Sequence, residues 1–195
     1  MTEHARMLRG QWYDANFDPE LAEMRLAAKE LCWRLNALAP SQAKEQEQLL
    51  RTIVGHLGDA TVVLTPFMVD YGFNVSIGAG SFINHDSYLM DCAPITIGHH
   101  VFIGPRFGAY TAQHPLVAEQ RNTGLERALP IVIEDDCWLG GNVTIMPGVT
   151  IGEGSVIGAG SVVTRDIPAG SLAMGVPCRV VRQITDEDRI TREEA

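Results

Sequence analysis

His114 is the residue of this 195-residue chain whose side chain is best suited to moving a proton near neutral pH. It lies in the run YTAQHP (Tyr110–Pro115), which follows neither helical nor strand periodicity. An imidazole titrates near neutrality, so it can take the proton of a hydroxyl group as that group attacks. An isolated loop histidine is more often an exposed bystander, however, and the residues by themselves leave both interpretations open.

A second set of polar side chains precedes this run, in the segment VDYGFNVSIGAGSFINHDSYLMD that begins at Val69. The set comprises Asp70, Tyr71, Asn84, Asp86 and Asp91. Carboxylates bind sugar hydroxyls well, because each oxygen accepts charge-assisted hydrogen bonds. Aspartate and asparagine are also common in turns, where their side chains bond nearby backbone groups. Ligand binding and turn formation therefore remain alternatives at these positions.

The elements that must position these side chains show a repeat of six residues. This period fits neither an α-helix, with 3.6 residues per turn, nor a single strand, with two. It fits a solenoid in which each six-residue unit forms a short strand and a bend. Three units make one coil, so Ile133 should stack over Ile151 and Leu139 over Ile157, about 4.8 Å apart. The clearest repeated positions are Ile133, Leu139, Ile145, Ile151, Ile157 and Val163.

The same step recurs upstream, with an offset and then a gap. The aliphatic positions are first Ile77, Ile83 and Leu89, and then, two residues out of phase, Ile97, Ile103 and Ala109. Two extra residues must therefore be absorbed at 91–94. Farther along, the repeat would place Arg121 and Arg127 inside the coil, where unpaired charged side chains are almost never buried. We therefore expect residues 111–130 to form a loop extruded from the coil, and long loops in compact domains are usually functional.

Residues 1–58 have helical character instead. Asp18 can cap a helix that has Pro19 at its first position and ends at Pro40. One face of this helix carries Leu21, Met24, Ala28, Leu31 and Leu35. Ser41 is expected to cap a second helix, and its apolar stripe should stop at Gly58.

Composition restricts the partners of the chain. A net charge of −9 argues against a nucleic-acid partner, which requires a basic face. No apolar run approaches the ~20 residues of a membrane helix, and the charged start does not resemble a signal peptide. Four scattered cysteines fit a reducing compartment better than a disulfide framework. We therefore expect a cytoplasmic protein without a nucleic-acid or membrane partner.

The hexapeptide pattern resembles that of the hexapeptide-repeat acyltransferases, a family built on a left-handed parallel β-helix. The runs MLRGQWYDANFDPEL and KELCWRLNAL also resemble the N-terminal segment of maltose acetyltransferases. The resemblance implies a mainly β fold with a helical N-terminal segment (1–58), a β-helix domain (59–183) that extrudes the loop 111–130, and a charged C-terminal tail (184–195).

The same resemblance implies a function for individual residues. His114 would be the general base, Asn84 would position it, and the Gly141 amide would stabilise the oxyanion of the thioester carbonyl. The acceptor-binding residues would be Asp14, Asp70, Tyr71 and Asp91. At Asp70 the chain follows the maltose type, whereas the galactoside type tends to carry serine.

The acyl donor implied by the resemblance is acetyl-CoA, whose phosphates require local cations on an acidic chain. Arg165, Arg179 and Arg182 fall where the family binds these phosphates, and Arg165 replaces a frequent lysine. The full coenzyme-binding set is Trp138, Gly141, Ala159, Gly160, Thr164, Arg165, Arg179 and Arg182.

The sequence therefore predicts an acetyl-CoA-dependent O-acetyltransferase that modifies a hydroxyl, C6 being expected, of a sugar such as maltose, glucose or a galactoside. The resemblance implies a homotrimer with sites between subunits and no metal. Lipo-oligosaccharide, amino-sugar and antibiotic acceptors remain open. A hexapeptide carbonic anhydrase would need three histidines converging on a metal, and His85, His99, His100 and His114 match no such motif. A purely structural β-helix would lack both the His-Pro loop and the helical N-terminus.

Overall fold

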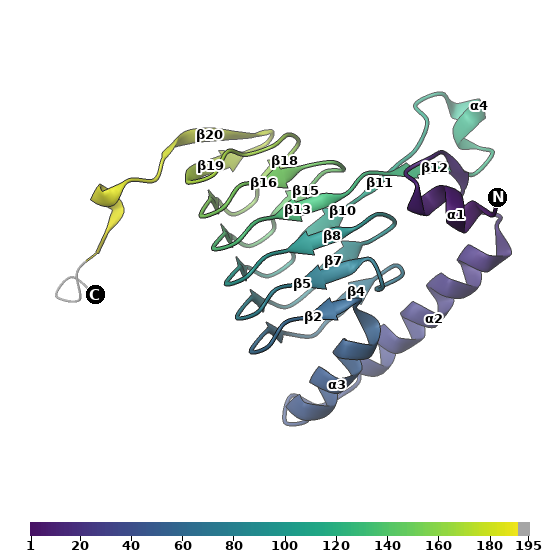
Figure 1. The fold of residues 1–195 in the computed structure, drawn as a ribbon, viewed down its shortest axis with the longest axis horizontal. Helices are drawn as coiled ribbons and strands as arrows, with labels where there is room; N and C mark the ends of the chain where they lie inside the picture. The colour runs from purple at the N-terminus through teal and green to yellow at the C-terminus, as the bar shows by residue number, and fades with distance from the viewer. Residues whose placement is uncertain (191–195) are drawn as a thin grey trace.

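The chain winds into a left-handed parallel β-helix with three flat faces, capped at its start by helices and carrying a loop on one edge (Figure 1). The computed structural model describes residues 1–190. The first face consists of β2 (His56–Leu57), β5 (Val75–Ile77), β8 (Ile95–Ile97), β13 (Ile131–Ile133) and β16 (Thr150–Ile151). The second face consists of β3 (Val62–Val63), β6 (Phe82–Ile83), β9 (Phe102–Ile103), β14 (Trp138–Leu139), β17 (Val156–Ile157), β19 (Ser171–Gly175) and β20 (Cys178–Gln183). The third face consists of β4 (Phe67–Val69), β7 (Ser87–Met90), β10 (Gly108–Tyr110), β15 (Thr144–Ile145) and β18 (Val162–Val163).

The six-residue period arises because every sixth side chain points into the shaft between these faces. Ile133 pairs with Ile151, and Leu139 pairs with Ile157, as the spacing predicts. These four side chains are at most 1% exposed. Burying each one contributes about 1.5–3 kcal/mol. The hexapeptide prediction is therefore confirmed, down to which residue lies over which.

The lower coils are two residues longer. Ile77 pairs with Ile97 and Leu89 with Ala109, so that each partner lies 20 positions onward. The two extra residues predicted at 91–94 are confirmed by this register. A second offset escaped the sequence analysis: Val69 pairs with Leu89 and belongs to a still earlier coil. That coil begins with β2, just ahead of residue 59.

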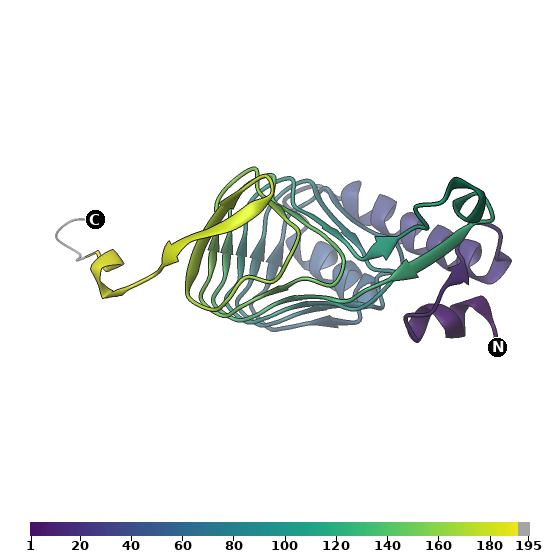
Figure 2. The same ribbon diagram turned by 90° about the horizontal axis from the view of Figure 1, so that it is seen from above.

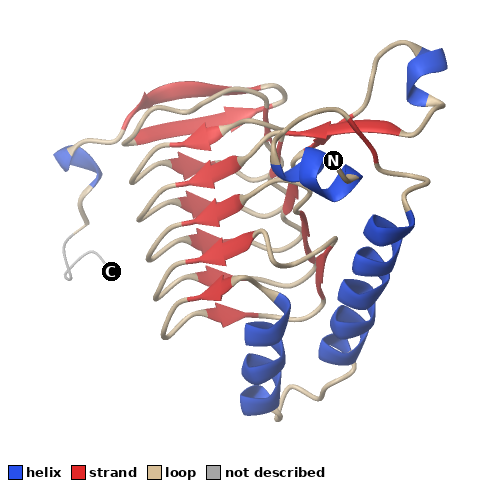
Figure 3. Ribbon diagram, turned by 45° about the vertical axis from the view of Figure 1, so that its right-hand side comes forward, coloured by secondary structure: helices blue, strands red, loops and turns tan. Residues whose placement is uncertain are grey.

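Two helices close the start of the shaft: α2 (Pro19–Asn36) and α3 (Ala43–Ile53) (Figure 3). Asp18 caps α2 by accepting a hydrogen bond from the Leu21 amide at 2.9 Å, as predicted. Asn36 exchanges two hydrogen bonds with the backbone of Phe67, which occupies an otherwise open strand edge of the third face.

Three details of these helices differ from the prediction. The first helix ends at Asn36, before Pro40. Gln42 rather than Ser41 occupies the N-cap of α3, and it makes no side-chain cap bond. The second helix stops at Ile53 and not near Gly58, because the chain must turn there to enter β2.

The remaining elements lie at the two sides of the coil. The short helix α1 (Glu3–Leu8) and β1 (Tyr13–Asp14) pack beside the extruded loop, which contains β11 (Ala112–Gln113), α4 (Ala118–Arg121) and β12 (Leu125–Ala128). On the opposite side the chain leaves β20 and forms the 3₁₀ turn η1 (Asp186–Asp188) (Figure 2). Part of the predicted tail, 191–195, lies outside the described residues. Within residues 1–190, no helix combines the length and apolarity needed to cross a membrane.

Candidate active site

The extruded loop is a β-hairpin that the N-terminal segment completes. β11 pairs antiparallel with β12, and β1 adds to the other side of β12, giving a three-stranded sheet outside the coil. Arg127, which the shaft could not hold, lies over the Trp12 ring at 5.1 Å and donates to Gln113 Oε1 at 3.1 Å. The loop therefore leaves the coil because its arginines find partners only outside.

His114 follows β11, and a backbone carbonyl holds one of its ring nitrogens. Its Nδ1 lies 3.0 Å from the carbonyl oxygen of Leu125. A carbonyl only accepts, so Nδ1 carries the proton and Nε2 is the basic nitrogen. The side chain is 44% exposed, and a cleft of about 740 Å³ adjoins it. Met146 and Pro147 from a later coil also line that cleft. The geometry suits proton abstraction by Nε2.

The sequence analysis missed Glu126. Its Oε2 lies 3.6 Å from His114 Nε2, and its Oε1 accepts a hydrogen bond from the Tyr13 hydroxyl. Glu126 is only 8% exposed and Tyr13 is fully buried. Burial, with Cys92 and Glu126 nearby, holds the pKa of Tyr13 far above its usual range, so the phenol stays a donor. No hexapeptide signal marks Glu126, whose only sequence cue is its place in the loop that holds His114.

Of the acceptor-binding candidates, Asp14 and Asp70 lie on the same side of the coil as His114. A small buried cluster that includes Tyr13, Tyr71 and Cys92 joins β1 to the turn after β4. Asp14 Oδ1 accepts the amide of Phe17 at 2.9 Å, as in a turn. Asp70 Oδ1 accepts the Tyr88 hydroxyl, and its side chain remains only half-buried. Both carboxylates keep free acceptor capacity beyond these contacts.

The predicted role of Asp91 as an acceptor-binding residue is corrected by its position in the structure. It is fully buried, and its carboxylate accepts the backbone amides of Asp70, Tyr71 and Asn74 at 3.0, 2.8 and 3.3 Å. Burial raises the pKa of Asp91 to about 6, although the backbone amides of Tyr71 and Asn74 oppose the shift. A carboxylate enclosed in this way stabilises the 70–74 turn and cannot contact a sugar directly. Tyr71 is also buried, and its hydroxyl accepts from Arg25 at 2.7 Å.

Asn84, Gly141, Ala159 and Gly160 gather on a different edge, where the second face turns into the third. Asn84 accepts the His85 amide at 2.8 Å and contacts no catalytic side chain of its own chain. The Gly141 amide has no hydrogen-bond partner among residues 1–190, nor has that of Ala159. Gly104 leaves the Gly141 amide accessible, because a Cβ at position 104 would lie 2.5 Å from the Gly141 nitrogen. These free amides suit an oxyanion and an extended amide-bearing ligand.

The remaining coenzyme-binding candidates lie along the later coils. Trp138 is 57% exposed and stacks between Phe102 and Val156 on the outer surface of the second face. Thr164 and Arg165 are exposed beyond β18, and Arg165 forms no ion pair within residues 1–190. Arg179 donates to the Cys178 carbonyl at 2.7 Å.

Arg182 is already paired. Its guanidinium donates to both carboxylate oxygens of Asp188, at 2.6 and 2.7 Å. These hydrogen bonds lower the pKa of Asp188 to about 2. The predicted phosphate ligand therefore holds a carboxylate of its own chain in this structure.

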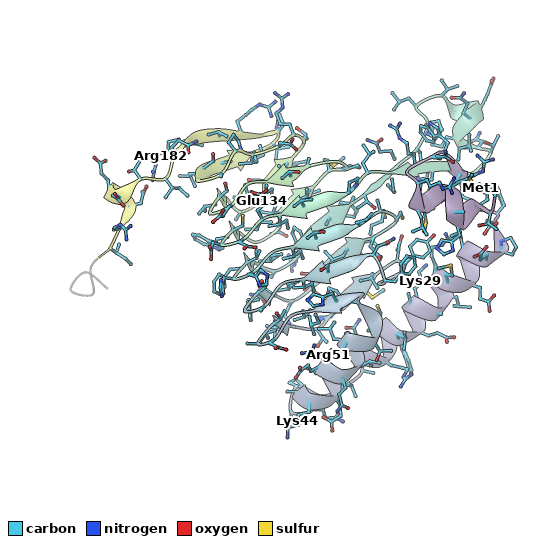
Figure 4. The ribbon with its side chains drawn as sticks, in the orientation of Figure 1. Met1, Lys29, Lys44, Arg51, Glu134 and Arg182 are labelled. Carbon is cyan, nitrogen blue, oxygen red and sulfur yellow. The ribbon has the colours of Figure 1, made fainter. Side chains whose placement is uncertain are left out.

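One chain does not bring the two halves of the site together. His114 and Asp70 lie where the third face turns into the first, whereas Asn84 and Gly141 lie at the other end of the third face. At about 3.3 Å per residue, a four-residue strand separates the two edges by roughly 10 Å or more. Arg182 lies still farther away, across the molecule from Met1 (Figure 4). Among the described residues, no group of three or more His, Cys, Asp or Glu side chains could hold a metal ion.

Known proteins share both the sequence and the fold of this chain. A maltose acetyltransferase hexapeptide capping motif matches residues 6–58, and six bacterial transferase hexapeptide repeats match residues 130–165. The structure of a maltose O-acetyltransferase from Clostridium difficile 630 superposes with a TM-score of 0.93 at 41% identity, covering 95% of this chain and 99% of the other.

Two further structures contain the coenzyme. A hexapeptide-repeat acetyltransferase of Vibrio cholerae O1 biovar eltor, complexed with acetyl-CoA, is 41% identical with a TM-score of 0.87, covering 95% of this chain and all of that one. A galactoside acetyltransferase in complex with coenzyme A is 36% identical with a TM-score of 0.91, covering 96% of this chain and 94% of the other. Acetyl-CoA is thus the acyl donor. The chain belongs to the maltose/galactoside O-acetyltransferase family of hexapeptide-repeat acyltransferases.

Proposed function

We propose that the chain acetylates a primary hydroxyl, C6, of a neutral sugar such as maltose, glucose or a galactoside, with His114 as the general base. One observation carries this proposal: Nδ1 of His114 is held by the Leu125 carbonyl, so that Nε2 is the basic nitrogen of a side chain that lines the cleft. A nitrogen fixed in this tautomer is ready to accept a hydroxyl proton.

The reaction follows from these groups. His114 takes the proton as the sugar oxygen bonds to the thioester carbonyl carbon. The Gly141 amide donates to the carbonyl oxygen as negative charge develops there. The carbon–sulfur bond then breaks, and the imidazolium returns its proton to the departing thiolate. Asp14 and Asp70 bind other hydroxyls of the sugar through charge-assisted hydrogen bonds.

The active assembly is a homotrimer whose sites lie between subunits. This proposal is supported by the separation of His114 from Asn84 and Gly141 on different edges of one chain. A threefold axis places one edge of each copy against the other edge of its neighbour, and such head-to-tail contacts close into a ring. Asn84 and Gly141 of one subunit then complete the site of the next.

Acetyl-CoA consumption over a panel of neutral sugars, amino sugars and sugar phosphates tests the substrate class directly. Neutral sugars should be the best acceptors, because Asp14, Asp70 and Glu126 repel an anionic group. NMR of the product locates the new ester. Turnover confined to amino sugars, with N-acetylated product, would contradict the proposal.

Asp70→Asn should raise the KM for the sugar about tenfold, which corresponds to the loss of one charge-assisted hydrogen bond. The KM for acetyl-CoA should stay unchanged, because the carboxylate does not face the coenzyme. The asparagine retains an oxygen for the Tyr88 hydroxyl, so the turn is preserved. Asp59→Asn is the matched control, since that side chain is fully exposed at the base of the coil. A lower melting temperature with both KM values unchanged would show that Asp70 only forms a turn.

The pairing of Arg182 with Asp188 leads to a separate prediction about the binding of acetyl-CoA, the acyl donor. If Arg182 binds coenzyme phosphate, Asp188 competes for the same guanidinium, and Asp188→Asn should tighten acetyl-CoA binding. The pair is exposed to solvent, so the gain should be small, up to about fivefold, and salt should diminish it.

Isothermal titration of acetyl-CoA measures this effect. Asp186→Asn is the control, because Asp186 pairs with Arg189 in the same turn and not with Arg182. Arg182→Ala should weaken binding in either background. Unchanged affinity in both Asp188→Asn and Arg182→Ala would place the phosphates elsewhere.

A further inference from the structure

The N-terminal strand reaches the catalytic loop through a buried hydrogen bond. β1 pairs with β12 so that Tyr13 lies opposite Glu126, 113 positions away in the chain. The Tyr13 hydroxyl donates to Glu126 Oε1, and both residues are buried. An ionised carboxylate is costly to bury without partners, so its orientation depends strongly on this donor.

The other oxygen of the carboxylate faces the base. Oε2 lies 3.6 Å from His114 Nε2, while Nδ1 is held by Leu125. Before reaction, Nε2 and Oε2 are both acceptors and cannot bond to each other. Once Nε2 has taken the hydroxyl proton, the imidazolium carries a positive charge, and its Nε2 lies 3.6 Å from a negative carboxylate oxygen. Glu126 therefore stabilises the imidazolium that the reaction creates and not the resting imidazole.

We propose that Tyr13 is a positioning residue for acetyl transfer and acts through Glu126. Its hydroxyl occupies Oε1 and so directs Oε2 at the nitrogen that receives the proton. This inference rests on the proposed role of His114 as the base. It gives the N-terminal segment a part in the chemistry, because only the pairing of β1 with β12 brings the phenol to the loop.

Every proton transfer in this reaction has a named donor and a named acceptor. The acceptor O–H bond breaks and the Nε2–H bond forms while the new C–O bond is made. The C–S bond then breaks, and the proton moves from Nε2 to the thiolate. Glu126 gains and loses no proton, so no further reactant is needed. Its contribution is the attraction between its negative charge and the transient positive charge on His114.

A double-mutant cycle tests this coupling. Glu126→Gln should lower kcat about 30-fold, because the amide carries no charge, while both KM values change less than about twofold. Tyr13→Phe keeps the buried ring and should lower kcat about fivefold. In the Glu126→Gln background, Tyr13→Phe should cost less than about twofold more, because the charge it orients is already gone.

Two control variants distinguish a failure of the positioning role from a failure of the proposed function. Ala28→Gly destabilises helix α2 at a buried position away from the site and should leave kcat unchanged at assay temperature. Tyr13→Phe in a His114→Ala background should have no effect on kcat. Full kcat in Tyr13→Phe, or an equal loss from Tyr13→Phe in the wild-type and Glu126→Gln backgrounds, would overturn the positioning role. High activity of His114→Ala would instead overturn the proposed function itself.

Discussion

His114→Ala should lower kcat with the best acceptor about 10²–10⁴-fold, the usual cost of losing a general base. The fold should survive, because His114 lies on a loop outside the shaft and is 44% exposed. The substitution removes one side-chain bond, from Nδ1 to the Leu125 carbonyl. Steady-state kinetics alongside a melting curve and the oligomeric mass measure both consequences.

The matched control is His56→Ala. His56 is exposed on β2, at the base of the coil, and has no part in the proposed site. Its replacement should leave turnover within about twofold, as expected of surface substitutions. If His114→Ala kept most of its turnover, the base would have to be sought elsewhere. A variant that lost its oligomeric state as well as its activity would show that the loop is chiefly an assembly contact.

The coil was predictable because its stability repeats. Each position such as Ile145 is buried by the same geometry as Ile133 or Val163, so a single burial rule acts every six residues. The earliest coil was harder to predict. Its inward positions, including Leu57 and Val69, precede a second two-residue extension at the 70–74 turn, which breaks the period before it can be read.

A helix boundary could be predicted only where the interaction that fixes it is between residues close in sequence. The Asp18 cap needs only the amide of Leu21, three residues away, and was predictable. The end of α3 at Ile53 depends on how the chain enters β2, so the turn-forming residue Gly58 misled the prediction. At its start, Gln42 takes the N-cap position without a side-chain bond, so no capping signal marks that boundary.

The site residues also differ in whether a local sequence pattern is enough to identify their role. His114 was accessible from a short motif. Asp91 has the composition of a ligand, but only the fold reveals that three backbone amides surround its carboxylate. The contact between Glu126 and Tyr13 joins segments 113 positions apart, and no local pattern reports such a pairing. What the sequence could not predict are interactions created by the coil bringing distant segments to one edge.

Two inactive variants should restore activity to each other when their subunits mix. If every site combines His114 from one subunit with Asn84 from its neighbour, His114→Ala and Asn84→Ala each inactivate a different half. Asn84→Ala should fold, because the Asn84 side chain bonds only the next amide along the chain, that of His85. Co-expression at equal levels should then place an intact His114 beside an intact Asn84 in about one quarter of the sites of a random trimer.

The measurement is the specific activity of the whole co-expressed trimer population, purified through one tag that both variants carry, against each variant alone. Mixing the two purified homotrimers without unfolding is the control, since stable rings should not exchange and should stay inactive. A double variant carrying both substitutions, co-expressed with wild-type chains, should recover activity only from adjacent wild-type pairs, which also make up about one quarter of sites. If both halves came from one chain, complementation would fail, while the wild-type mixture would recover about half. The ratio between the two mixtures therefore decides whether the separation of His114 and Asn84 on one chain is closed by a neighbouring subunit.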